Sequence, residues 1–132
     1  MEQPKTFSIV LVSPDLEKLH ASAIMGSGAA MAGMDVNIFV TMEALRAFLK
    51  KTIEQRSFVK SGIGATLLDK KVPLFYQLFQ QAKELGKLHI YACAMSADIM
   101  GWKKEDMVDV IDDIIGVNKF FSLSMAGPIV TM

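Results

Sequence analysis

The residue with the clearest chemical potential is Cys93, the single cysteine of this 132-residue chain. It directly follows an apolar run, Leu88–Ala92, that predicts a buried strand, and a short helix is predicted near Ser96–Met100. We therefore expect the thiol at the carboxyl edge of a sheet, where open α/β folds bind ligands. Backbone N–H groups and the positive end of the helix would favour the thiolate there. An equally simple interpretation is that Cys93 is a small buried apolar side chain.

Three residues that follow the cysteine are candidate binding residues. Ser96 offers a hydroxyl that either donates to the sulfur or caps the helix. Asp98 would disfavour the thiolate form of Cys93, because a carboxylate close to the sulfur disfavours a second negative charge. Met95, together with Met100, would give the thiol a soft and apolar lining.

The chain has two histidines that could serve as a base for the thiol. His89 precedes Cys93 by four residues on the same predicted strand, which places it about 13 Å away in an extended chain. His20 lies one turn into the first predicted helix, whose start also belongs to the carboxyl edge of the sheet. His20 is therefore a candidate to approach the site, and the alternative is a histidine on the helix surface without a catalytic role.

The cysteine count excludes several classes of thiol chemistry. A thioredoxin-type dithiol needs a second cysteine, and a cysteine-based zinc cluster needs more than one. A peroxidase needs a resolving thiol or an outside reductant, so it ranks lower. What remains is a thiolate that accepts a group and passes it on, such as a sulfane sulfur held as a persulfide. We expect no metal site and no cofactor.

Apolar runs alternate with helical patterns along the whole chain. Strands are predicted at Phe7–Ser13, Val36–Thr41, Leu88–Ala92, near Val110–Ile114 and at Ile129–Met132. Helices are predicted at Leu16–Gly33, Met42–Lys50, Leu74–Leu85, near Ser96–Met100 and near Val117–Met125. This alternation predicts one α/β domain over residues 1–132 with a mainly parallel sheet, interrupted by a long mobile connection at about 51–71.

The first predicted helix is unusual because apolar and small residues occupy every side of it after His20. A helix of this kind has to be covered on every side. The sheet covers one face, and we infer that another subunit covers the other, which predicts a homo-oligomer. Gly26, Gly28 and Gly33 match no phosphate-binding spacing, so close helix packing is the better explanation for them.

Composition narrows the location and the partners of the protein. Fourteen basic residues balance fourteen acidic ones, which argues against a strongly electrostatic binder of nucleic acid. The sequence has no signal-peptide pattern at its start and no apolar run of the roughly 18–20 residues that a spanning helix needs. We therefore expect a cytoplasmic protein without stable membrane insertion. Basic residues cluster between positions 46 and 71, where they form either a solvated face or a guide for an anionic sulfur donor.

The segment around the cysteine also matches a known pattern. The stretch Ala92–Asp109 resembles the cysteine segment of the DsrE/DsrF-like sulfur-relay family, in the branch often labelled "peroxiredoxin family protein". The matching positions are Cys93, Met95, Ser96, Asp98, Met100, Gly101, Lys103, Lys104 and Glu105. The segments Ala29–Val36, Ile38–Thr41 and Gln80–Gly86 agree as well.

The resemblance implies a three-layer α/β/α sandwich with a sheet of about five strands, assembled as a homotrimer or a larger ring. It implies a sulfurtransferase-like carrier rather than a conventional turnover enzyme. In that role Cys93 holds a persulfide between a rhodanese-like or TusA-like donor and an acceptor protein, with Met95, Ser96 and Asp98 as motif neighbours. Two alternatives stay open: a ligand-binding or regulatory α/β oligomer in which Cys93 only lines the pocket, and a purely structural oligomer.

Overall fold

The protein, described here over residues 5–132 by a computed structural model, contains one sheet of five parallel strands. The strands lie in the order β4-β3-β2-β1-β5. Their bounds are Thr6–Leu11 for β1, Asp35–Val40 for β2, Leu88–Cys93 for β3, Asp113–Ile115 for β4 and Ile129–Thr131 for β5. The predicted parallel sheet of about five strands is confirmed.

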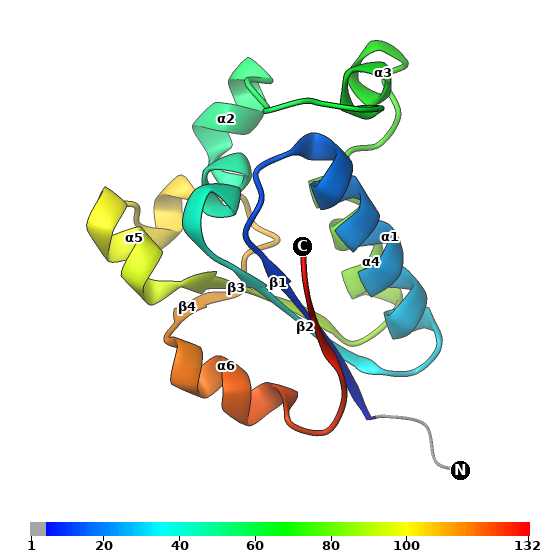
Figure 1. Ribbon diagram of the computed structural model, residues 1–132, viewed down its shortest axis with the longest axis vertical. Helices are drawn as coiled ribbons and strands as arrows, with labels where there is room; N and C mark the ends of the chain where they lie inside the picture. Colours follow the sequence, from blue (N-terminus) through cyan, green and yellow to red (C-terminus); the bar gives the residue numbers. More distant parts are fainter. Residues whose placement is uncertain (1–4) are drawn as a thin grey trace.

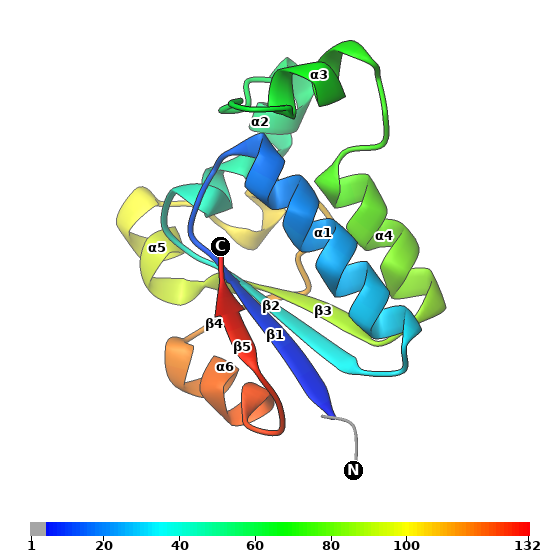
Figure 2. The same cartoon turned by 45° about the vertical axis from the view of Figure 1, so that its right-hand side comes forward.

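Helices cover both faces of this sheet, so the fold has the three layers that the sequence predicts (Figure 1). One face carries α1 (Leu16–Met31) and α4 (Phe75–Leu85), which lie side by side (Figure 2). The other face carries α6 (Val117–Ser124), and α5 (Ala94–Met100) follows β3 at the carboxyl edge. Shorter elements complete the chain: η1 (Met42–Phe48), α2 (Lys50–Gln55), α3 (Gly64–Asp69) and η2 (Lys104–Asp106).

Strand residues alternate between the two helical layers, because successive side chains on a strand point to opposite faces. Ile9, Ile38 and Ile90 lie side by side across β1, β2 and β3 and belong to the core beneath α1 and α4. Their neighbours Val10 and Phe39 face α6 and belong to a second, smaller cluster. Apolar residues on both faces explain why the strands read as continuous apolar runs in the sequence.

The start of α1 is fixed by Asp15, whose side chain accepts a hydrogen bond from the Glu17 N–H at 3.1 Å. Further along, Gly26 brings the helix close to the sheet, since a Cβ there would lie 3.3 Å from the Ile38 Cδ1 atom. The helix also packs against α4 along its length (Figure 2). The sheet and α4 thus cover two sides of α1, while Ile24, Met25 and Met31 stay exposed on the remaining side. That a second subunit covers this exposed side stays a prediction.

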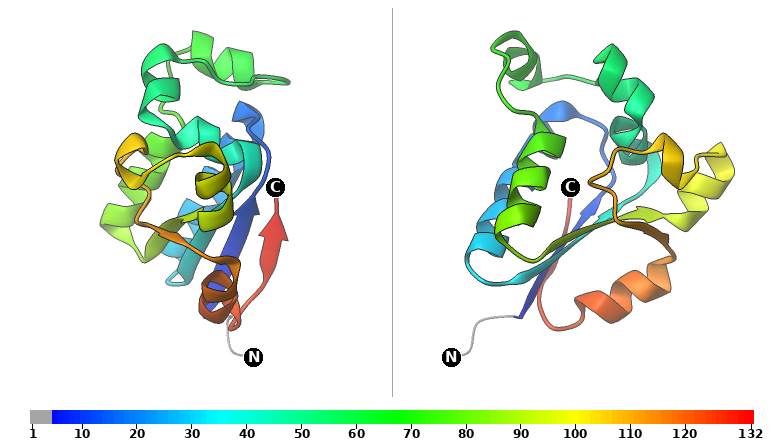
Figure 3. Two further views of the ribbon diagram at one scale, coloured as in Figure 1. Left: turned by 90° about the vertical axis from the view of Figure 1, so that its left-hand side faces the viewer. Right: turned by 180° about the vertical axis from the view of Figure 1, so that it is seen from behind.

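Two predictions need correction. The interval 51–71, predicted as irregular, contains most of α2 and all of α3, which lie at one end of the molecule beyond the start of α1 (Figure 3). Whether this interval is mobile stays a prediction. The fourth strand lies at Asp113–Ile115 rather than near Val110–Ile114, because Val110 and Ile111 fill the core from a connecting segment.

Within the described residues 5–132, no helix combines the length and the apolar character that crossing a membrane requires.

Candidate functional site

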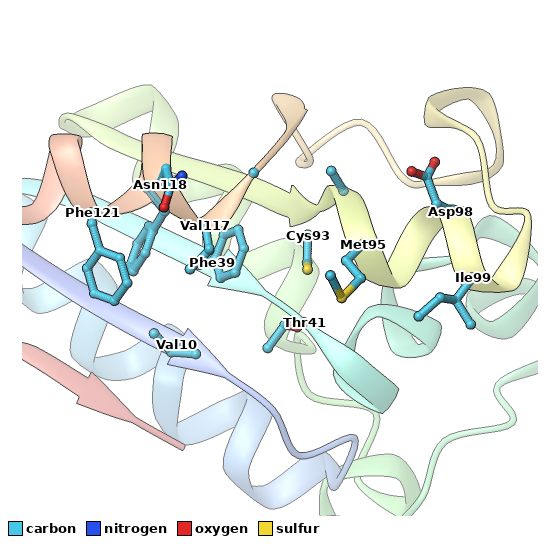
Figure 4. A pocket seen from close by; sticks show the side chains of 13 residues that line it. Val10, Phe39, Thr41, Cys93, Met95, Asp98, Ile99, Val117, Asn118 and Phe121 are labelled. Atoms are coloured by element: carbon cyan, nitrogen blue, oxygen red, sulfur yellow. The ribbon is translucent and has the colours of Figure 1, made fainter.

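Cys93 lies at the junction that the sequence predicts, as the last residue of β3 and immediately before α5. Its side chain is on the α6 face of the sheet, with the sulfur directed into a cavity (Figure 4). The residue is 8% exposed, so the sulfur is largely enclosed but opens on one side. Cys93 is thus both packed against the sheet and accessible through the cavity.

Two hydroxyl groups lie beside the sulfur. The Ser96 Oγ atom is 3.2 Å from the Thr41 Oγ1 atom, and it accepts a hydrogen bond from the Met42 N–H at 3.0 Å. Because the Met42 N–H already donates to Ser96, the Ser96 proton is free to point toward Thr41 or toward the cysteine. This arrangement ties the end of β2 to the first turn of α5 directly beneath the thiol.

The electrostatics of the site favour the thiolate form of Cys93. Burial alone raises the pKa of the thiol, because it penalises the charged form. Hydrogen bonds from the hydroxyls of Ser96 and Thr41 and from the backbone N–H groups of Ser96 and Met95 act in the opposite direction and prevail. The pKa of Cys93 therefore lies below its ordinary value of 9.0, as a nucleophilic or group-carrying cysteine requires.

The cavity in front of the sulfur has a volume of about 690 Å³. Its floor is built by Phe39 from β2 and Phe120 from α6, which are almost fully buried and stack with ring centroids 4.8 Å apart. Val10 from β1 extends this floor away from the cysteine (Figure 4). The floor is therefore apolar, and both aromatic rings are held by packing.

The rim of the cavity is apolar as well. Met95 and Ile99 border it from α5, while Val117 and Phe121 border it from α6 (Figure 4). These four side chains are between 48% and 74% exposed. A continuous set of exposed apolar side chains around a concave site indicates a surface that binds another molecule.

The structure brings most of the predicted binding residues to Cys93, with one exception. Met95 and Asp98 line the cavity, and Ser96 hydrogen-bonds at its base. His20 lies on α1, on the opposite face of the sheet, and does not line the cavity (Figure 1). The expectation that His20 approaches the thiol is wrong, because the start of α1 crosses to the other layer before His20 is reached.

Asp98 lies in the predicted part of the site, but its side chain is not oriented as expected. It belongs to α5 and lines the cavity wall, but its carboxylate points away from the Cys93 sulfur (Figure 4). The carboxylate therefore does not stand against the thiolate at close range, and its charge acts at the outer wall of the cavity.

Sequence reasoning about the cysteine segment alone missed the residues that other elements contribute. Thr41, Phe39 and Asn118 all line the cavity. Phe39 of β2 pairs with Tyr91 of β3. Thr41 and Cys93 each follow two residues after these partners, so the same register places Thr41 beside the cysteine. The signal for Thr41 was available: it follows the second predicted strand, and the carboxyl ends of parallel strands meet at one edge.

The chain is similar to known proteins in both sequence and fold. It matches the DsrE/DsrF/DrsH-like family over residues 57–130, a range that includes Cys93, α5 and α6. The uncharacterized protein YrkE of Bacillus subtilis is 28% identical over 139 residues, covering 84% of this chain and 86% of YrkE.

A solved structure supports the same architecture. MTH1491 of Methanobacterium thermoautotrophicum, a protein of unknown function, superposes with a TM-score of 0.62 at 8% identity. The superposition covers 96% of this chain and 98% of that one, and at this identity it shows the fold alone. With the family match spanning more than half of the sequence, the chain belongs to the DsrE/DsrF/DrsH-like family.

Proposed function

We propose that the protein is a sulfur-relay component that carries sulfane sulfur as a persulfide on Cys93. The observation that carries the proposal is the setting of this thiol: it opens into a cavity, and hydrogen bonds from Ser96 and Thr41 hold its pKa below 9.0. Membership of the DsrE/DsrF/DrsH-like family supports a function of the sulfur-relay type.

The loading step is a thiolate attack on a sulfane sulfur. The Cys93 thiolate attacks the outer sulfur of a donor persulfide, R–S–SH, forming a new S–S bond while the donor S–S bond breaks. The products are Cys93–S–SH and the thiolate R–S⁻, so atoms and charge balance without an oxidant or reductant. Ser96 and Thr41 stabilise the attacking thiolate, and the cavity leaves room for the added sulfur.

The cysteine count determines how the sulfur leaves. With Cys93 as the single cysteine, no thiol of the same chain can attack the persulfide and release the outer sulfur. The persulfide must therefore pass its sulfur to an acceptor thiol outside the chain. We propose a sulfurtransferase-type donor, rhodanese-like or TusA-like, an acceptor protein and a homo-oligomeric carrier in the cytoplasm.

The proposal is tested by incubating the full chain with an excess of a low-molecular-weight persulfide and measuring its intact mass. We expect the wild type to gain one sulfur atom and to lose it again on reduction. Cys93→Ser should remain unmodified, whereas Ser122→Ala, which changes an exposed serine on α6, should load like the wild type. A wild type that stays unmodified with every sulfane-sulfur donor tried, charged or uncharged, contradicts the proposal.

One observation favours a second function, the binding of a small ligand with Cys93 as lining only. The cavity volume of about 690 Å³ lies within the range of roughly 300–1,000 Å³ typical of small-molecule sites. The two functions differ in what Cys93→Ser does. A ligand whose affinity survives this substitution, in a wild type that never acquires sulfur, would establish the ligand-binding function instead.

A further inference from the structure

The charge of the cavity is informative about the sulfur compound that fits it. Within residues 5–132, no lysine, arginine or histidine lines the cavity, and the one charged side chain in its wall is Asp98. The other polar side chains that line the cavity are Thr41 and Asn118, both uncharged. The cavity therefore offers hydrogen bonds but no positive charge.

The cations that the sequence places between positions 46 and 71 do not supply this charge. Arg46 pairs with Glu43 and lies over the Trp102 ring, 5.2 Å from its centroid, outside the cavity. None of the other basic residues of this interval lines the cavity either. The expectation that these residues guide an anionic sulfur donor to the thiol finds no support in the geometry of the site.

Binding of an anionic sulfur donor in this cavity would be energetically unfavourable. Thiosulfate or a glutathione-type persulfide would give up water around its charge without gaining a cation, and it would meet the negative field of Asp98. An uncharged apolar molecule gains instead, since it covers the Phe39 and Phe120 floor and the exposed rim formed by Met95 and Phe121.

We propose that the cavity binds an uncharged, apolar sulfane-sulfur compound, such as cyclic sulfur, which loads Cys93 directly. This inference rests on the proposed function and names the substrate class of the same site. In the loading step the Cys93 thiolate attacks one ring sulfur of cyclo-octasulfur, so that one Sγ–S bond forms and one ring S–S bond breaks. The negative charge moves to the end of the opened chain, so the product is a polysulfide that carries all eight ring sulfurs on Cys93, and this step needs no co-reactant. An acceptor thiol outside the chain then cleaves this polysulfide and takes up sulfur, which leaves a shorter chain or a persulfide on Cys93.

The first experiment measures occupancy without sulfur chemistry, using Cys93→Ser and two fluorescent probes. N-phenylnaphthylamine is uncharged, and anilinonaphthalene sulfonate adds one negative charge to the same aromatic skeleton. We expect the uncharged probe to bind at least about tenfold more tightly, the ratio that corresponds to about 1.4 kcal/mol. Cyclo-octasulfur should displace it, and thiosulfate should not. Equal affinity for both probes, or no binding of either, would overturn the inference.

A charge introduced at the rim sharpens this test. Val117 is half-exposed in the cavity rim, so Val117→Lys places a cation there with little loss of packing. We expect this variant to bind the sulfonate probe about tenfold more tightly than its parent. The matched control is Ile24→Lys, because Ile24 is exposed on α1 on the other face of the sheet. An equal gain in the control would show that the probe does not report on this cavity and would count against the inference.

The second experiment measures loading of the wild type by intact mass, with cyclo-octasulfur and thiosulfate as alternative donors. The inference predicts that cyclo-octasulfur adds sulfur to Cys93 at least about tenfold faster than thiosulfate does. Loading by thiosulfate or by a charged persulfide alone would overturn this inference and leave the proposed function intact. Probe binding without loading by any donor would instead overturn the proposed function.

Discussion

The two faces of the sheet are built from the same strands but packed to different degrees. Beneath α1 and α4, residues such as Leu19 and Phe79 are fully buried, and the core is continuous across β1, β2 and β3. Beneath α6 the buried cluster is small, and it gives way to a cavity of about 690 Å³ that reaches Cys93. One face therefore holds the fold together, while the other leaves a thiol accessible.

The comparison shows how a reactive cysteine can be kept on a stable scaffold. Cys93 ends a strand whose opposite face, through Ile90, is fixed in the main core. The strand cannot shift without disturbing that core, so the sulfur stays in register with Thr41 and Ser96. The predictions below separate stability on one face from reactivity on the other.

The largest effect on stability is expected from Phe79 in the closed core. Phe79→Ala should lower the free energy of unfolding by about 3–5 kcal/mol, because it leaves a cavity among fully buried side chains. Phe121→Ala, at the half-exposed cavity rim, should cost less than about 1 kcal/mol. Urea unfolding of both variants gives the two values. Similar losses of stability in the two variants would contradict the view that the α1/α4 face of the sheet contributes more to stability than the α6 face does.

A smaller loss is expected from Ser96, and it comes with a change in reactivity. Ser96→Ala leaves the Met42 N–H and the Thr41 hydroxyl without this partner, which should cost about 1–3 kcal/mol. The pKa of Cys93 should rise, so alkylation by iodoacetamide should slow at neutral pH. Ser122→Ala is the control, because its hydroxyl donates to the Lys119 carbonyl and neither residue lines the cavity. Unchanged alkylation in Ser96→Ala would show that this hydroxyl does not stabilise the thiolate.

A gain in stability is expected at Met42, where the chain leaves β2. Met42 has φ +53°, a left-handed conformation that strains residues with a side chain. Met42→Gly keeps the N–H that donates to Ser96 and should raise the free energy of unfolding by about 0.5–1 kcal/mol. Ile24→Gly, at an exposed position inside α1, should lower it by about 0.5–1 kcal/mol. Effects of the same sign in both variants would rule out strain at Met42.

The smallest effect is expected in the pH dependence of stability. Because folding lowers the pKa of Cys93 below 9.0, the folded state binds the thiol proton less tightly than the unfolded state does. The difference in stability between the wild type and Cys93→Ser should therefore grow as the pH rises from the folded pKa toward 9.0, then level off. Below the folded pKa the difference should become independent of pH, so that only the effect of exchanging the thiol for a hydroxyl remains. Urea unfolding over this range would contradict the account if the difference were constant.

Much of this architecture follows from the sequence because its signals are local. The three long strands are apolar runs bounded by turn and cap residues, and Cys93, Ser96 and Met95 lie within one turn of each other along the chain. The position of β4 was predicted less accurately than the positions of the three long strands. Val110 and Ile111 are as apolar as strand residues, yet they fill the core from a connecting segment.

The parts of the site that the sequence did not predict depend on long-range geometry. Alternation of strands and helices does not indicate which face of the sheet each helix covers, so His20 was a candidate for the thiol site although α1 lies on the other face. The cavity floor could not be predicted for the same reason. Phe39 and Phe120 come from separate elements and meet only after α6 packs on the sheet. The residues that flank the cysteine in sequence were predictable, and Thr41 was predictable from the shared edge of the parallel strands. The aromatic floor was not, because it depends on how α6 packs on the sheet.

The most direct test of the central claim is the rate at which iodoacetamide alkylates Cys93 in the folded wild type as a function of pH. The account predicts a single titration with its midpoint below that of the same thiol in the urea-unfolded chain, and a faster reaction at neutral pH than an unperturbed thiol shows. A midpoint equal to or above that of the unfolded chain, or a thiol that reacts only after unfolding, would contradict it.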